Sequence, residues 1–132
     1  MTIIFTTGPI DNSILNVNIV EILIRNTDPS SSANVTVSFY NESSSPELLV
    51  NLDSFTVSPN STEREVYSAA SLSSFLVEVE IELNNRNDAT TATAVHPTVT
   101  LFDATSEFVQ FVRLLVSTQK PCKTLTIQLR HK

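Results

Sequence analysis

The most reactive side chains of this sequence are two histidines and one cysteine. His96 and His131 are far apart in the chain, and Cys122 lies between Lys120 and Lys123. A metal site needs three or four ligands that converge on one point. A thiol enzyme needs a base and an oxyanion hole beside its cysteine. Because the sequence suggests neither arrangement, we expect no catalytic residue, no metal site and no cofactor, and the chain is not expected to be an enzyme.

A row of glutamates is the second feature that could do chemistry. Glu78, Glu80 and Glu82 alternate with apolar residues over positions 75–83, which is typical of a β-strand. On a strand they project from one face about 7 Å apart, too widely spread to give Ca²⁺ its six to eight oxygens. Paired carboxylates can also hydrolyse glycosides. We expect instead an acidic face that meets water, or basic side chains across a strand or an interface.

The composition favours an all-β protein of one domain. Of the 132 residues, 14 are Val, 9 Ile and 16 Thr, and these β-branched side chains suit strands better than helices. The length is that of an ordinary single domain. One cysteine excludes an internal disulfide, so the core alone must stabilise the fold.

Charge is distributed unevenly along the chain. Residues 1–112 contain fourteen acidic and three basic residues, whereas residues 113–132 contain five basic residues and no acidic one. The net charge of −6 disfavours a nucleic-acid binder or an anionic-membrane binder. The basic segment alternates with Leu125, Ile127 and Leu129, so it is predicted to be a folded strand rather than a nucleic-acid tail.

Hydrophobic alternation predicts about eight strands, separated by turns rich in Asn, Asp, Ser and Pro. The predicted strands are 14–25, 35–39, 48–57, 63–67, 75–83, 97–102, 108–116 and 124–130. We therefore expect an eight-stranded jelly roll, or a related two-sheet sandwich, over residues 14–132.

Three of these segments carry more specific expectations. The apolar residues change from odd to even positions near Ile19, which predicts a bulge or bend in the strand over 14–25. Residues 84–94 are predicted to form a polar loop. Over residues 108–116, apolar side chains occupy both odd and even positions, as expected for a strand covered on both faces or for a surface buried by a neighbouring subunit.

Residues 1–13 are predicted to form an N-terminal connector arm. Ile3, Ile4 and Phe5 are followed by Gly8 and Pro9, a pair that predicts a hinge. Apolar residues on an unpaired arm need burial, and an edge strand of a neighbouring copy would provide it. The sequence leaves open a second possibility, in which the arm completes the sheet of its own chain.

A flexible arm, a compact Ser/Thr/Asn-rich domain of eight strands and no visible secretory signal together resemble the subunits of bacterial endospore appendages, the Ena-type fibres. The resemblance covers residues 1–12 as connector, with the Gly8-Pro9 hinge, and the strands from Ile14 to Arg130. It implies a jelly roll whose connector reaches into a neighbouring subunit, and sheets that augment one another to build a fibre on the spore surface. Because this connector lacks cysteine, the resemblance is to a non-covalent subtype.

The function expected from the sequence is that of a self-assembling structural subunit, forming a pilus-like homopolymer through its arm. Its expected partners are copies of itself, with a spore-surface anchor or tip protein as a further one. Neither nucleic acid nor membrane insertion is expected. Two other functions stay open: a viral or phage capsid or decoration jelly roll, and a carbohydrate-binding module.

Overall fold

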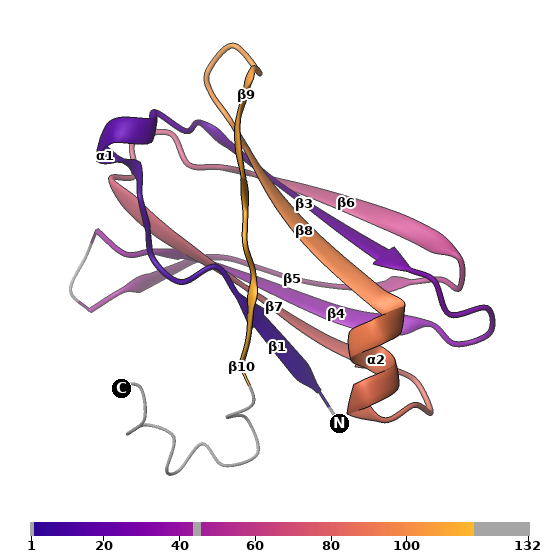
Figure 1. Ribbon diagram of the computed structural model, residues 1–132. Coiled ribbons are helices and arrows are strands. Elements are labelled where there is room, and N and C mark those ends of the chain that lie inside the picture. The colour runs from indigo at the N-terminus through magenta and orange to yellow at the C-terminus, as the bar shows by residue number, and fades with distance from the viewer. Residues whose placement is uncertain (1, 44–45, 118–132) are drawn as a thin grey trace.

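The computed structural model describes residues 2–43 and 46–117, and they form two antiparallel sheets packed face to face (Figure 1). The all-β class and the two-sheet sandwich predicted from the sequence are confirmed. The elements are β1 (Ile3–Thr6), β2 (Ile10–Asp11), α1 (Asn12–Leu15), β3 (Ile19–Asn26), β4 (Ala33–Asn41), β5 (Leu48–Val57), β6 (Ser61–Ser68), β7 (Ser74–Leu83), α2 (Asp88–Ala94), β8 (Val95–Phe102), β9 (Phe108–Val112) and β10 (Leu115–Ser117). Sheet A has the order β10-β1-β7-β4-β5, with β2 also beside β7, and sheet B has the order β6-β3-β8-β9.

Strand β7 is the centre of sheet A. It pairs with β1 and β2 along one edge and with β4 along the other. Its inward row is almost completely buried and consists of Phe75, Val77, Val79, Ile81 and Leu83. Because successive residues of a strand point to opposite faces, the glutamates between them lie on the outer face of sheet A. The strand predicted from this alternation is confirmed.

An aromatic cluster joins the two sheets. The ring of Phe39, on β4, stacks on that of Tyr67, on β6, with a centroid distance of 5.5 Å. It also contacts the ring of Phe75 at 5.7 Å. The Tyr67 hydroxyl donates a hydrogen bond of 2.7 Å to Asp53 Oδ2 on β5, which gives its polar end a partner inside the sandwich.

The strand predicted over 14–25 is wrong in its first part. Residues 12–15 form the short helix α1, Asn16 follows in the left-handed conformation (φ 58°), and β3 begins only at Ile19. Buried Asn12 stabilises this turn, because its side chain accepts from Val17 N and donates to Val17 O. The change of parity therefore marks a helix and a turn, not a bulge within one strand.

The polar loop predicted over 84–94 is also wrong in part, because residues 88–94 form helix α2. Asn87 caps this helix by accepting a 2.8 Å hydrogen bond from Thr90 N. The segment is rich in threonine, which has low helix propensity, so its composition hid the helix. Neither described helix is long and apolar enough to cross a membrane.

Residues 108–116 divide between the two sheets. Strand β9 pairs with β8 in sheet B, and after Arg113 and Leu114 the chain continues as β10, which pairs with β1 in sheet A. In Figure 1 this segment crosses from one sheet to the other along one side of the sandwich. The strand predicted over 124–130 lies outside the described residues.

The turn between β3 and β4 is organised by one buried side chain. Asn26 Nδ2 donates to Ser31 O at 2.8 Å and to Val57 O at 3.2 Å, and its Oδ1 accepts from Asp28 N at 3.0 Å. Asp28 in turn accepts from the backbone of Ser30 and Ser31, and these bonds lower the pKa of its carboxyl to about 2.

Replacing Asn26 should therefore destabilise the fold without touching any edge of the sheets. Asn26→Ala leaves buried backbone carbonyls without donors, and we expect it to lower the free energy of unfolding by about 2 to 4 kcal/mol. Urea denaturation followed by circular dichroism measures this. Asn34→Ala is the matched control, because Asn34 is exposed and its side chain bonds only to other exposed side chains. Equal losses in the two variants would contradict the role of Asn26.

Candidate assembly interface

The predicted arm residues lie in β1, which pairs within its own chain. Ile3 and Phe5 are 7% and 8% exposed and belong to the core, while Ile4 lies on the outer face of sheet A. Strand β1 pairs with β7 on one side and with β10 on the other. The described chain thus shows the arm completing its own sheet, the possibility that the sequence left open beside docking on a neighbour.

The predicted hinge residues lie where the strand along β7 is interrupted. Strand β1 ends at Thr6, β2 resumes at Ile10, and Gly8 between them has a φ of +66°. A side chain disfavours this left-handed conformation, so the backbone here is one that glycine adopts readily. Thr7 donates its N–H to Val77 O and accepts from Val77 N through its hydroxyl, both at 3.0 Å, which keeps the interruption close to β7.

Strand β5 forms one edge of sheet A and exposes large apolar side chains. Residues 48–52 of this strand form the β5 edge. Leu48, Leu49, Val50 and Leu52 are 53%, 50%, 47% and 58% exposed, and the register against β4 shifts at this point. These four residues carry no charge, and no proline lies among them. An uncharged apolar edge is what soluble proteins avoid unless something covers it.

Two stretches of free backbone in the described part of sheet B are protected. Strand β6, one edge of sheet B, carries Glu63 and Arg64, both exposed, and Glu65, which is half-buried. Beside β8, the backbone carbonyls of Ala94 and Phe102 accept hydrogen bonds from residues that flank β3. Pro97 is at an odd-numbered position, so its backbone points to the other side of β8, beyond the stretch that pairs with β9. Proline has no N–H to offer an incoming strand. Charge and proline thus protect these stretches, whereas the β5 edge has neither.

Acidic residues flank the β5 edge. The carboxyl of Glu47 hydrogen-bonds that of Glu42, and this bond, with partial burial and mutual repulsion, raises the pKa of Glu42 to about 7. Glu42 Oε2 is buried and has no hydrogen-bond partner among the described residues. Asp53 follows immediately after the edge. The end of the β4–β5 hairpin therefore combines apolar side chains with a cluster of acidic residues.

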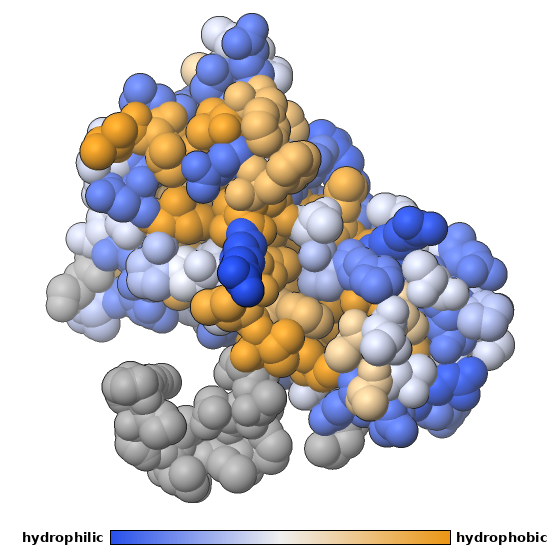
Figure 2. All heavy atoms as spheres, in the orientation of Figure 1, coloured by the Kyte–Doolittle hydropathy of each residue, from blue (hydrophilic) through white to orange (hydrophobic). Residues whose placement is uncertain are grey.

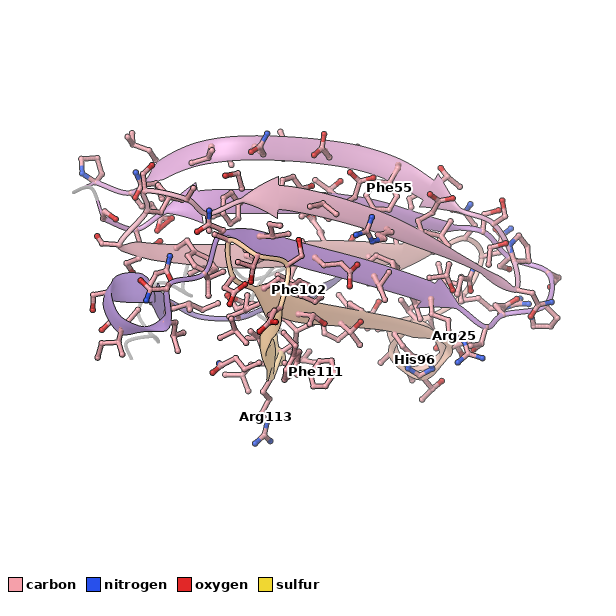
Figure 3. All side chains as sticks on the ribbon, turned by 90° about the horizontal axis from the view of Figure 1, so that it is seen from above. Arg25, Phe55, His96, Phe102, Phe111 and Arg113 are labelled. Carbon is pink, nitrogen blue, oxygen red and sulfur yellow. The ribbon has the colours of Figure 1, made fainter. Side chains whose placement is uncertain are left out.

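Strand β10, the opposite edge of sheet A, and strand β9, an edge of sheet B, are also apolar. Phe108, Phe111, Leu115 and Val116, along β9 and β10, are 54% to 72% exposed, and the rings of Phe108 and Phe111 are 4.9 Å apart. Figure 2 shows apolar atoms gathered on the face that these strands cross. Beside them is a groove of about 440 Å³ between the two sheets, with Phe5 in its wall. In Figure 3 Arg113 projects away from the body of the molecule on this side.

Of the two histidines and the cysteine first considered for chemistry, the structure describes His96. His96 is exposed and pairs in register with Arg25, and the two side chains lie close together in Figure 3. Within residues 2–43 and 46–117, no group of three His, Cys, Asp or Glu is placed to hold a metal ion. Cys122 and His131 lie outside the described residues.

Sequence reasoning missed the β5 edge, although it predicted strand over 48–57. The available signal was a run of apolar residues on both parities over 48–50, without lysine or proline. That signal does not distinguish a buried strand from an exposed edge, because strand order depends on long-range pairing. The apolar pattern over 108–116 was recognised. A strand covered on both faces is not what the described chain shows, because large apolar side chains of this segment are exposed, and burial by a neighbouring subunit stays a prediction.

Comparisons with known proteins add little to this geometry. No family model matches the chain, and no curated protein matches it in sequence. Among solved structures, the chain is similar to that titled "Crystal Structure of Thermotoga maritima 1070", at 16% identity and a TM-score of 0.42, over 87% of this chain and 89% of that one.

The Glu42–Glu47 pair predicts a pH dependence of stability. Because the folded-state pKa of Glu42 is raised from 4.5 to about 7, the folded protein binds a proton more tightly than the unfolded chain. The free energy of unfolding should therefore fall as the pH rises from 4.5 to about 7. Urea denaturation at several pH values measures this slope. Glu42→Gln should flatten the slope in this range, and Glu63→Gln, on the β6 edge, should not; equal slopes in all three proteins would contradict the assignment.

Proposed function

We propose that this protein is a structural subunit that joins copies of itself into a non-covalent homopolymer by exchange of β1. The observation that carries the proposal is the position of β1, which contributes Ile3 and Phe5 to the core, pairs with a strand on each edge and is connected to the rest of the described fold through the Gly8-Pro9 hinge. If the hinge opens, β1 can make the same contacts in the corresponding position of a neighbour.

Energetics decide which form is favoured. Burying Ile3 and Phe5 contributes about 1.5 to 3 kcal/mol each, and each ladder hydrogen bond about 0.5 to 1.5 kcal/mol. These contributions are the same whether β1 docks in its own chain or in the next one, so they cancel between the closed and exchanged forms. Association costs about 4 to 15 kcal/mol. Exchange therefore requires additional contacts between copies, and exposed apolar edges are where such contacts can form.

The type of exchange sets the form of the assembly. Reciprocal exchange between two copies closes a dimer, whereas exchange passed from each copy to the next gives an open chain of subunits, or a ring if the rotation between copies closes. The resemblance to endospore appendages favours the open form and a fibre on the spore surface. Exposed apolar side chains along both edges of sheet A also support an open form, because each copy then has two different surfaces to offer.

A pair of engineered cysteines should show where β1 docks. Thr7 N donates to Val77 O, so the adjacent Thr6–Glu78 pair is of the non-hydrogen-bonded type, with Cα atoms about 4.5 Å apart, close enough for a disulfide. In the Cys122→Ser background, Thr6→Cys with Glu78→Cys should give a ladder of covalently linked copies on a non-reducing denaturing gel.

The control is Thr36→Cys with Glu80→Cys, which joins β4 to β7 inside one domain through a hydrogen-bonded pair whose Cα atoms, about 5.5 Å apart, also suit a disulfide. It should give only a cross-linked monomer, since nothing in the proposal moves β4. If Thr6→Cys with Glu78→Cys also gives only the monomer, at every protein concentration tested, β1 docks in its own chain and the exchange is refuted.

A further inference from the structure

The β5 edge presents a specific problem of recognition. It offers unpaired backbone groups, exposed leucines and a nearby pair of carboxyls, Glu42 and Glu47. Added strands bind such edges through main-chain hydrogen bonds, with alternate side chains supplying specificity. The fitting occupant is an extended segment that is apolar on alternate positions and positively charged.

One segment of this chain has that chemistry. Residues 124–130 place Leu125, Ile127 and Leu129 on one parity and polar residues on the other. The fifteen residues beyond the described region, 118–132, contain two lysines before this segment, an arginine within it and a lysine after it, and no acidic residue. The segment is thus complementary to the β5 edge in both hydrophobic pattern and charge.

The geometry favours a segment from another copy over the chain's own. Residue 117 ends β10, at the opposite edge of sheet A from β5, and a strand added to β5 would lie five strand spacings, or about 24 Å, from β10. The seven Cα steps from residue 117 to residue 124 span at most about 25 Å when fully extended, and the chain would also have to pass over the side chains of the outer face. Docking on the β5 edge of a neighbouring copy does not require this crossing.

We propose that the β5 edge of one copy binds residues 124–130 of a second copy as an added strand of sheet A. The contact joins two different surfaces, so it can repeat from copy to copy and gives an open chain unless the rotation between copies closes a ring. This inference deepens the proposed function, since it supplies the additional contact that β1 exchange requires. It also assigns a partner to the basic end of the chain.

Photo-cross-linking of the full-length protein tests the contact directly. A benzoylphenylalanine placed at Leu52, on the exposed β5 edge, is activated in an equal mixture of ¹⁴N-labelled and ¹⁵N-labelled protein, and the products are mapped by mass spectrometry. We expect cross-links to residues 124–130 that contain one light and one heavy peptide. The same probe at Val66, on the charged β6 edge and 43% exposed, is the control and should not reach that segment.

Each outcome decides the matter. Cross-links to 124–130 with only matched isotopes would show that the segment docks on its own chain, and cross-links to another segment, or none, would show that the β5 edge has a different occupant or no occupant. Any of these results overturns the proposal. Raising the salt to about 1 M should reduce the mixed-isotope yield severalfold, because screening weakens the charge complementarity.

A second variant tests the same edge without a probe. Leu52→Lys places on the β5 edge the charge that natural edges use for protection, and it should reduce the sedimenting assembled fraction at least tenfold. Val66→Lys, the matched change on β6, should leave that fraction unchanged; equal effects of the two variants would overturn the proposal.

The two proposals can fail separately. A disulfide ladder through Thr6→Cys and Glu78→Cys without mixed-isotope cross-links refutes only the β5-edge contact. Mixed-isotope cross-links with an intramolecular disulfide refute only the exchange of β1.

Discussion

The fold depends on the burial of one face of β7. Its five inward side chains are at most 1% exposed, and this is possible only if sheet B covers them and if β1 and β4 flank the strand. In the registers of β1 and β4 against β7, apolar residues face inward and polar residues face outward. A slip of β7 by one residue would therefore place its glutamates in the core. This constraint fixes sheet A, and it makes the position of β1 indispensable to the core whether that strand comes from the same chain or from another.

The edges of the sheets then determine how the protein meets its surroundings. Sheet B has the charged strand β6 at one edge and β9, with exposed phenylalanines, at the other, whereas sheet A ends in apolar residues at both edges, β5 and β10. Since exchange of β1 creates no new contact by itself, the proposed assembly would need its favourable free energy from these edges. The charges suit the proposed contact between copies, because the acidic pair Glu42 and Glu47 lies beside the β5 edge and the sequence beyond β10 is basic.

Sequence reasoning succeeded where the signal is local. The alternation over 75–83 and the high content of β-branched residues were enough to predict β7 and the all-β sandwich. It failed at α2, where the cap formed by Asn87 outweighs the low helix propensity of threonine, and at α1, where buried Asn12 holds a turn that looked like strand. The order of the strands could not be predicted from the sequence, because the exposure of Leu52 and the position of Ile3 beside β7 depend on pairings between distant segments. Hence the arm was recognised as apolar without a decision on its acceptor, and the β5 edge was not recognised as an edge.

The central claim is that this chain assembles with itself without disulfides. Sedimentation velocity of the full-length protein, with reductant present and over a wide range of concentration, tests it most directly. The account predicts a distribution that extends continuously from the 14.5 kDa monomer to large species as concentration rises, with filaments visible by electron microscopy in the same samples. A single monomeric species at every concentration would contradict it.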